Sequence, residues 1–217
     1  MNAEQTETLD GDVRNLNGQR IGPKGQRTMR KLIDAAVQLL ETTGLRDLSV
    51  AEVARSAGTS PATFYVYFEG VPELVLEALK TAPHCDDELL CLASEDWSGD
   101  PAKAAEEFVD RYIARWQRHR TLYRVRNLAG EEGDKRFVDA RSTAARPVLD
   151  ALARNVAGSK SSRRIDTEVS DFAVAAAIVM MLERVSALYQ IMPEMGDGNA
   201  RELRDAAVFA VLQILGY

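Results

Sequence analysis

The chain has 217 residues, of which 46% are hydrophobic and 28% are charged, and its formal net charge is −6. This length and apolar content indicate an ordinary globular protein with one or two domains rather than a disordered or low-complexity chain. The negative net charge argues against a protein that is covered with nucleic-acid-binding surface, so any such contact has to be local.

Targeting and redox signals point to the cytoplasm. Acidic residues without a following apolar stretch occupy the N-terminus, which is not the pattern of a secretory signal or a transit peptide. The longest apolar run, residues 172–182, is far shorter than the roughly 20 residues of a membrane-spanning helix, so we expect no membrane segment. In a cytosolic protein the thiols of Cys85 and Cys91 stay reduced, and we expect no disulfide.

Positive charge is concentrated near the N-terminus. Residues 1–22 are polar and aperiodic and read as a flexible arm. Residues 13–33 contain no acidic side chain but hold several basic ones: Arg14, Arg20, Lys24, Arg27, Arg30 and Lys31. Such a run is commonly only a solvated arm, so it indicates nucleic-acid contact only together with the elements that follow it.

The first three predicted helices are short and closely spaced. An apolar stripe from Met29 to Leu40 predicts the first, with Gly44 as its C-terminal cap. Ser49 and Glu52 form a capping box that starts the second helix, which stops at Gly58. After a Thr59-Ser60 link, Pro61 suits the first position of a third helix that ends near Phe68.

The second and third helices have the spacing of a helix-turn-helix unit, in which the second helix of the pair lies in the major groove of DNA. We expect Val53, Ala54 and Ala57 to pack against Phe64 and Phe68. The opposite face of the third helix would then carry Thr63, Tyr65, Val66 and Tyr67. These side chains suit hydrogen bonds to phosphates and base edges, whereas the alternative is that Tyr65 and Tyr67 are core aromatics.

Helical patterns continue to the end of the chain, and no pair of adjacent strands is indicated, so we predict an all-α fold of about nine helices. We expect further helices from Pro72 to Lys80, with a break or kink at Pro83, and after Asp100. A shorter one is predicted over 121–130, and a long one over 134–158 with a kink at Pro147. We expect Asp166 or Thr167 to cap a long helix that reaches Met192, and Asn199 to cap the last helix. The predicted domains are the arm (1–22), a helix-turn-helix domain (23–70) and a regulatory domain (71–217).

The segment from Leu32 to Leu79, especially residues 49–54, Ala57-Gly58, 63–65 and 67–68, resembles the DNA-binding domain of TetR-family regulators. The resemblance implies a homodimeric repressor that binds a palindromic operator and is released by a small molecule. It also implies that contacts to double-stranded DNA come from these residues: Ser49, Thr59, Ser60, Pro61, Ala62, Thr63, Tyr65 and Tyr67. From the basic arm we add Arg27 as a candidate contact.

One position departs from the family pattern. Where the family commonly has a phosphate-binding lysine at the start of the fourth helix, this chain has Val71. Arg20, Lys24 and Arg27 could replace that charge by reaching the DNA backbone or an adjacent minor groove. The alternative is a helical small-molecule or protein-binding module whose DNA binding is weakened.

In the regulatory region an aromatic stripe recurs every four residues, and a later apolar helix would form the opposite wall of a pocket. Such a stripe usually belongs to the hydrophobic core, whereas the family resemblance implies that part of it lines an effector cavity. The predicted lining residues are Phe108, Tyr112, Trp116, Phe172, Val179, Met180 and Glu183. Their character favours a small hydrophobic effector. Glu183 and Arg184 either pair, locally or at the dimer interface, or offer one polar anchor. Alanine-rich segments at residues 173–177 and 206–214 suggest that the two helices that contain them pack closely. The resemblance implies that these last two helices form the dimer interface.

Enzymatic and metal-binding functions find little support. The sequence has two histidines, His84 and His119, and no catalytic, phosphate-binding or dinucleotide-binding motif, so we expect no enzyme, no cofactor and no metal. The grouping of His84, Cys85 and Cys91 could be a metal or redox sensor, but its spacing does not match a strong ligand pattern.

Overall fold

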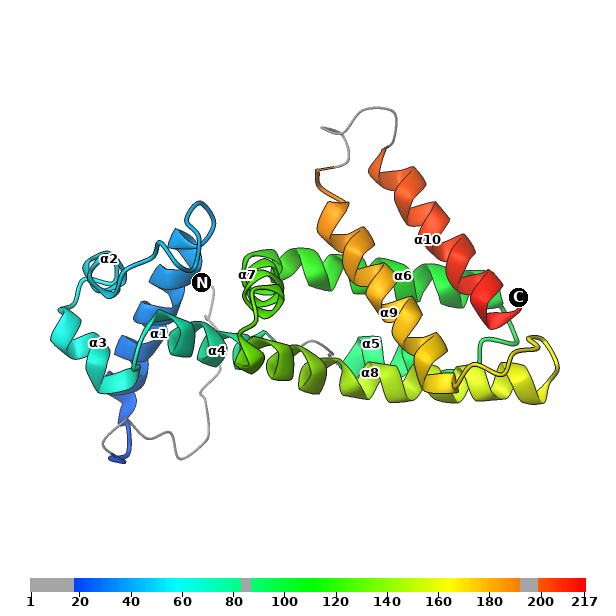
Figure 1. Cartoon of the computed structure of the whole chain (residues 1–217), viewed down its shortest axis with the longest axis horizontal. Helices are drawn as coiled ribbons and strands as arrows, with labels where there is room; N and C mark the ends of the chain where they lie inside the picture. Colours follow the sequence, from blue (N-terminus) through cyan, green and yellow to red (C-terminus); the bar gives the residue numbers. More distant parts are fainter. Residues whose placement is uncertain (1–17, 83–86, 192–198) are drawn as a thin grey trace, which may run out of the picture. The chain divides into compact units, whose positions relative to one another are not determined.

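The computed structural model describes residues 18–82, 87–191 and 199–217, and the fold within these ranges is all-α (Figure 1). Pro83, His84 and Cys85, and the predicted helix end at Met192, lie outside these ranges. The helices of the first part of the chain are α1 (Pro23–Leu39), α2 (Val50–Ser56), α3 (Pro61–Tyr67) and α4 (Val71–Thr81). Those that follow are α5 (Asp87–Ser94), α6 (Pro101–Arg118), α7 (Arg120–Glu131), α8 (Lys135–Ser161), α9 (Asp171–Leu188) and α10 (Ala200–Leu215).

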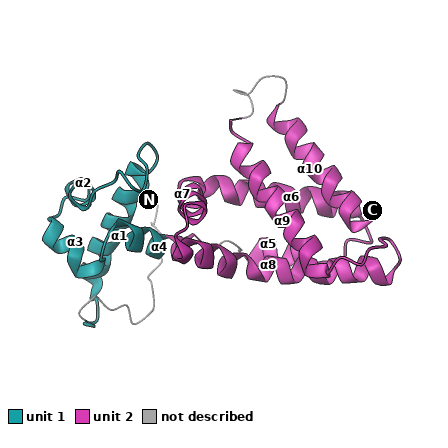
Figure 2. Ribbon diagram, viewed as in Figure 1, with its two compact units in different colours: residues 1–78 teal, residues 79–217 magenta. Residues whose placement is uncertain are grey.

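The chain divides into two compact units, residues 1–78 and 79–217 (Figure 2). We expected the boundary at residue 70, but it falls inside α4. The buried side chains of Leu74, Val75 and Ala78 explain the difference, because they give most of α4 an apolar face that belongs with the first unit.

The first unit is built around the apolar face of α1. Leu32, Ala36 and Leu40 are fully buried, as the predicted stripe requires. The end of this helix differs from the prediction, because α1 stops at Leu39 and Gly44 lies in the following turn rather than at the C-cap. At the other end, Ile21 is buried although it precedes the helix, so the polar arm contributes one residue to the core.

In the second unit, α8 packs against α5, α7 and α9, while α6 packs against α5, α9 and α10. Figure 1 shows α9 lying across α6 and α8, with α10 beside it. The large side chains that fill this interior are Trp97, Phe108, Tyr123, Phe137, Leu152 and Ile178. Among the described residues, no helix is long and apolar enough to cross a membrane.

Most helices start where the sequence predicts, and Asn199 is the cap that was expected for the last one. Asp100 caps α6, Asp134 caps α8 and Asn199 caps α10, each by accepting a hydrogen bond from a backbone N–H in the first turn. The predicted caps of α9 are wrong. Ser170 caps that helix, and the Thr167 hydroxyl instead accepts from the Val169 N–H in a local turn.

The sequence prediction also missed α5. Only Leu89 and Ala93 of this short helix are buried, a pattern too brief to show a helical period. Helix α5 packs against α8 and α6, and Glu88 of α5 forms an ion pair with Arg111 of α6 at 2.9 Å. Asn155 on α8 donates from its side chain to the Ala93 carbonyl at 2.8 Å, and the Trp97 indole donates to the Leu92 carbonyl at 2.9 Å.

Candidate nucleic-acid interface and regulatory cleft

The start of α2 is fixed by the predicted capping box. The Ser49 hydroxyl accepts from the Glu52 N–H at 3.2 Å, and the Ser49 N–H donates to the Glu52 carboxylate at 2.9 Å. Hydrogen bonds from the side chain and backbone of Ser49 hold the pKa of Glu52 below its usual value. The carboxylate therefore stays ionised near the positive end of the helix dipole.

The turn between α2 and α3 depends on Gly58, whose φ of +66° lies in the left-handed region that glycine tolerates. The Thr59 N–H then donates to the Ala54 carbonyl at 2.9 Å, which closes the end of α2. Ser60 caps α3 by accepting from the Thr63 N–H at 3.2 Å, and Pro61 occupies the first turn, as predicted. These contacts set the direction in which α3 leaves the turn.

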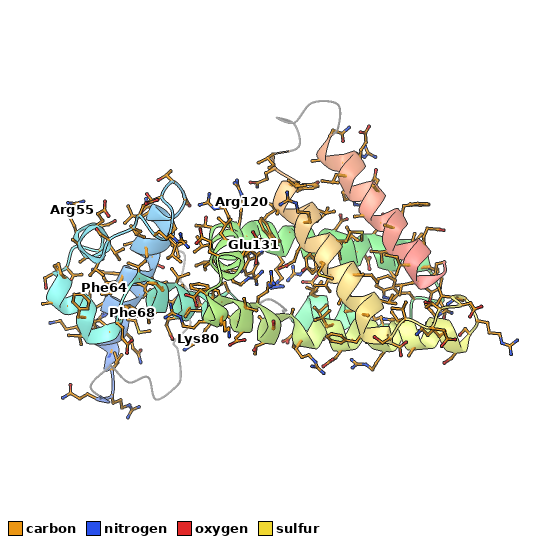
Figure 3. All side chains as sticks on the ribbon, in the orientation of Figure 1. Arg55, Phe64, Phe68, Lys80, Arg120 and Glu131 are labelled. Atoms are coloured by element: carbon orange, nitrogen blue, oxygen red, sulfur yellow. The ribbon has the colours of Figure 1, made fainter. Side chains whose placement is uncertain are left out.

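The two faces of α3 separate as expected. Phe64 and Phe68, labelled in Figure 3, are buried and their ring centroids lie 5.5 Å apart. Val53 and Ala54 of α2, the helix that packs against α3, are also buried, while Ala57 is only half-buried. This aromatic pair therefore anchors α3 and leaves its opposite face to solvent.

The candidate contact residues lie on that opposite face and at the turn that leads into α3. Tyr65 is 54% exposed and Val66 is also exposed, so the alternative of a core position is wrong for Tyr65. Pro61 and Ala62 are exposed, and Thr63 is half-buried. Three further candidates line the turns around them: Ser49, Thr59 and Ser60.

Tyr67 is half-buried rather than fully exposed. A Cβ placed on Gly25 would lie 3.3 Å from the Tyr67 hydroxyl and 2.6 Å from the Ile21 side chain. The hydroxyl of Tyr67 therefore sits beside the first turn of α1. The exposed basic residues Lys24 and Arg27 belong to that same turn and the next.

The basic candidates and Val71 differ in exposure. Arg20, Lys24 and Arg27 are exposed around the start of α1. Val71, at the family's usual lysine position, is buried at the first residue of α4. That position therefore contributes to packing and provides no charge.

The structure places the predicted effector residues in different surroundings. Phe108 and Tyr112 are buried in the packed interior, where their rings lie 6.3 Å apart and Trp97 packs against Phe108. Val179 is buried as well. Phe172 is exposed, and the Arg146 guanidinium lies 5.4 Å from its ring centroid. Helices α5, α9 and α10 all pack against α6, the helix that carries Phe108 and Tyr112.

Trp116, Met180 and Glu183 do come together. They line an open cleft of about 460 Å³ between the last turn of α6, α7, α8 and the C-terminal half of α9. The other lining residues are Arg120, Arg124, Asn127, Leu128, Glu131, Arg141, Arg184, Ala187, Leu188 and Ile191. A cleft of this size falls in the range of small-molecule sites. The sequence analysis missed the arginines of this cleft. They lie on three separate helices, and only the packing of those helices brings them together.

Glu183 is paired, but with Arg126 of α7 rather than with Arg184. An Arg126 guanidinium nitrogen lies 2.5 Å from the Glu183 carboxylate, and Arg126 is 2% exposed. Burial lowers the pKa of Arg126, and the negative charge of Glu183 opposes this shift. Burial also raises the pKa of Tyr112 well above its usual value, with Glu183 adding to the effect. The sequence signal for this pair was only a charged residue in an otherwise apolar helix.

Tyr123 joins this buried charge to the segment that follows α4. The Arg126 guanidinium lies 4.8 Å from the Tyr123 ring centroid, and Arg115 donates to the Tyr123 hydroxyl at 2.9 Å. The same hydroxyl donates to the Ala82 carbonyl at 3.2 Å. The wall of the cleft is thus connected through buried side chains to the residue directly after α4.

Within the described ranges, no group of histidine, cysteine and acidic residues is arranged to hold a metal ion. Cys91 is exposed, and its thiol donates to Glu95 at 3.4 Å, which raises the pKa of the thiol. A raised pKa makes a thiol less reactive at neutral pH. His84 and Cys85, the other members of the suggested sensor, lie outside the described residues.

An N-terminal helix-turn-helix followed by a larger helical unit with a cleft defines the class of helical DNA-binding regulators. Comparison with known families identifies the family within this class. Residues 32–78 match the family described as "Bacterial regulatory proteins, tetR family", and residues 89–216 match "Tetracyclin repressor-like, C-terminal domain". The chain belongs to the TetR family of transcriptional regulators and carries that family's DNA-binding domain. Members of this family are in general DNA-binding proteins rather than enzymes.

Among individual relatives, the chain is 41% identical over 51 residues to the HTH-type transcriptional regulator BetI of Brucella anthropi, covering 24% of this chain and 26% of that protein. It is 30% identical over 104 residues to the HTH-type transcriptional repressor DrrR1 of Streptomyces coeruleorubidus, covering 48% of this chain and 37% of that protein. The chain therefore matches well under two thirds of the length of these relatives. The fatty acid degradation regulator FadR from Bacillus halodurans shares the fold, with a TM-score of 0.63, 18% identity and coverage of 91% of this chain and 97% of that one.

Proposed function

We propose that this protein is a repressor that binds a palindromic operator as a homodimer, with α3 in the major groove, and that a small, largely apolar effector releases it. The observation that carries the proposal is the division of α3 into a buried face, Phe64 and Phe68, and an exposed face that includes Tyr65 and Val66. Tyr65 and Val66 keep a large part of their side chains in solvent. They suit hydrogen bonds to DNA and apolar contact with thymine methyl groups.

Other candidate residues support the same orientation. Ser60 caps the exposed start of α3, where the helix dipole favours phosphate, and Ser49 is exposed at the start of α2. Arg27 and its basic neighbours would add sequence-independent attraction to the DNA backbone. Repression is the output we propose, and the Streptomyces relative is named a repressor.

The proposed dimer surface is the outer face of α9 and α10. These helices pack against each other, and each exposes a large apolar side chain: Phe172 on α9 and Phe209 on α10. Phe209 is 65% exposed. Exposed large apolar side chains are typical of interaction sites, and a second copy of the same helix pair would bury them.

The proposed effector site is the cleft. Trp116, Met180 and Leu188 give it an apolar wall. Release of DNA requires that the effector bind better to the conformation whose recognition helices are wrongly spaced, since equal affinity for both states shifts nothing. The contacts from Glu183 through Arg126 and Tyr123 connect the cleft to Ala82, the residue directly after α4.

The proposal is tested by a gel shift and footprint with the DNA upstream of the protein's own gene. We expect a shifted complex and a two-fold symmetric footprint, because each subunit of a dimer presents one recognition helix. We expect a compound that dissociates the unmodified protein from its operator to have no such effect on Trp116→Ala. This variant should still bind the operator with the affinity of the unmodified protein. An asymmetric footprint would contradict the dimeric arrangement.

One observation favours a second function. Val71 is buried where the family commonly has a phosphate-binding lysine, so one phosphate contact is absent. The second candidate is therefore a helical small-molecule or protein-binding module with weakened DNA binding. It would show ligand or partner binding by the second unit without a shifted DNA complex.

A further inference from the structure

We infer that the cleft binds a small organic anion, with a carboxylate or phosphate group held by arginines and an apolar body lying against Trp116, Met180 and Leu188. This inference rests on the proposed function, because it names the chemical class of the effector. It revises the expectation of an effector with Glu183 as its one polar anchor.

The charge of the lining is the first argument. Arg120 and Arg124 are one turn apart on α7, and Arg141 and Arg184 add two guanidinium groups from α8 and α9. Figure 3 labels Arg120 and Glu131, the first and last residues of α7. The cleft therefore carries four positive charges, whereas the whole chain has a net charge of −6. Such a site attracts an anion.

The two lining carboxylates do not cancel this charge. Glu183 is bonded to Arg126, which lies behind the cleft wall and is not itself part of the lining. A cationic ligand would therefore have to compete with a buried arginine for Glu183. Glu131 is the remaining acid, so the lining keeps an excess of guanidinium groups.

Two of the arginines are available to a ligand. Within residues 18–82, 87–191 and 199–217, the side chains of Arg141 and Arg184 make no ion pair or hydrogen bond, whereas the Arg120 side chain donates to the Gln190 side chain at 2.9 Å. The planar guanidinium fork matches the oxygens of carboxylates and phosphates, and it can donate two parallel hydrogen bonds to them.

Trp116 provides an independent observation. Its side chain lines the cleft and is only 4% exposed, yet its indole Nε1–H has no hydrogen-bond acceptor among the described residues. A buried donor without an acceptor is unfavourable, and a purely hydrocarbon ligand would leave it so. A ligand that brings an oxygen acceptor to this wall would satisfy it.

The experiment measures binding of matched probes to the full-length protein by isothermal titration calorimetry. The probes share an eight-carbon chain and differ in the head group: octanoate, octyl phosphate, octanol and octylamine. We expect octanoate or octyl phosphate to bind about tenfold or more tightly than octanol and octylamine, because charge-assisted hydrogen bonds form only with the anions. The preference between the two anions identifies the head group as carboxylate or phosphate.

The variants are Arg141→Gln and Arg184→Gln, with Arg118→Gln as the matched control. Arg118 is exposed on α6 and is not part of the cleft lining. We expect both cleft variants to weaken binding of the preferred anion about tenfold and the control to leave it unchanged. Trp116→Phe should weaken it several-fold while keeping the aromatic wall. Arg184 lies on α9, which is also part of the proposed dimer surface, so light scattering on Arg184→Gln checks that the variant still forms a dimer. Arg141 lies on α8, outside that surface, and therefore tests the cleft alone.

The inference is overturned if no probe binds, if octanol or octylamine binds as tightly as the anions, or if the Arg118 variant loses as much affinity as the cleft variants. A gel shift without any probe distinguishes this failure from failure of the proposed function. Arg141→Gln should bind DNA like the unmodified protein. If the unmodified protein binds DNA but shows no preference for the anionic probes, the result counts against the anion site alone. If the unmodified protein does not bind DNA, the result counts against the proposed function.

Discussion

Arg126 and Glu183 form an ion pair across α7 and α9, with nitrogen and oxygen 2.5 Å apart and Arg126 almost wholly buried. The two residues are 57 positions apart in the sequence. Because Glu183 also lines the cleft, the stability of the second unit and the shape of its candidate site depend on the same pair.

Replacing Glu183 with leucine should therefore destabilise the second unit strongly. The change leaves the buried Arg126 charge without its partner, which in general costs about 3–5 kcal/mol of unfolding free energy. Urea denaturation followed by circular dichroism measures this loss. Glu131→Leu is the control, since Glu131 is exposed on the same cleft and should change stability by no more than about 0.5 kcal/mol. Equal effects of the two changes would show that the ion pair is not a stabilising element.

If α3 reads DNA, Tyr65→Phe and Tyr67→Phe should each weaken operator binding without unfolding the protein. Each change removes one hydroxyl, and a hydrogen bond worth about 0.5–1.5 kcal/mol corresponds to roughly 2- to 13-fold in affinity. Gel-shift titration at fixed salt gives the affinity, and thermal denaturation checks the fold. Unchanged affinity in both variants would remove the tyrosines from the interface.

The basic residues around the start of α1 should control the salt dependence of DNA binding. Arg20→Gln, Lys24→Gln and Arg27→Gln together remove three exposed charges, so the slope of log affinity against log salt should fall by up to about 3. Deletion of residues 1–25 is a poorer test, because it would also remove the buried Ile21 and the first turn of α1.

The control for this salt experiment makes the same change in net charge elsewhere. Arg118, Arg154 and Arg163 are exposed in the second unit, and their triple replacement with glutamine should leave the slope unaltered. A salt slope that stays the same in the first set of variants would show that the basic residues near α1 do not contact phosphates.

Phe209→Glu should convert the dimer to a monomer or make the protein insoluble. The substitution places an uncompensated charge at the most exposed large apolar residue of α10, where the proposed partner helix would bury it. Ala210, the neighbouring position, is half-buried within its own subunit and would confound packing with assembly. Light scattering measures the mass. Ala114→Glu, at an exposed alanine of α6, should keep the dimer. A normal dimer of the Phe209 variant would place the interface on another face.

Gly216→Ala should destabilise the second unit by more than its backbone conformation alone explains. Gly216 has φ of +75°, and an added Cβ would lie 2.6 Å from the Arg164 carbonyl oxygen, a backbone atom that cannot easily move. Gly133→Ala is the matched control, because Gly133 also has a positive φ, +97°, but open space around it. Left-handed strain costs about 1–2 kcal/mol at either position, and the close contact adds to it only at Gly216. Equal melting temperatures of the two variants would contradict the contact.

Local signals in the sequence predicted much of the fold. The Ser49–Glu52 capping box, Pro61 at the start of α3 and Asn199 before α10 each satisfy backbone groups within one turn of themselves, so no distant residue is needed to interpret them. The same holds for the alternation of Phe64 and Phe68 with Tyr65 along α3. Where several caps compete, as at Thr167 and Ser170, the sequence alone could not decide between them.

The cleft could not be predicted, because its residues depend on how separate helices pack. The spacing of Phe108, Tyr112 and Trp116 places all three on one face of α6, but only the packing of neighbouring helices decides that the first two are interior and the third lines the cleft. The partner of Glu183 was equally inaccessible. Arg126 lies in a sequence rich in arginines, and nothing local distinguishes it from its exposed neighbour Arg124.

Both tryptophans of the chain, Trp97 and Trp116, belong to the second unit, whereas the first unit has Tyr65 and Tyr67 as its aromatic chromophores besides phenylalanine. Intrinsic tryptophan fluorescence, excited selectively, is therefore a reporter of residues 79–217 alone. The helical circular dichroism signal reports on both units. A denaturation series recorded by the two methods would coincide if the units unfold as one cooperative block and would separate if they unfold independently. The natural distribution of tryptophan thus makes the cooperativity between the DNA-binding and regulatory units measurable without any label.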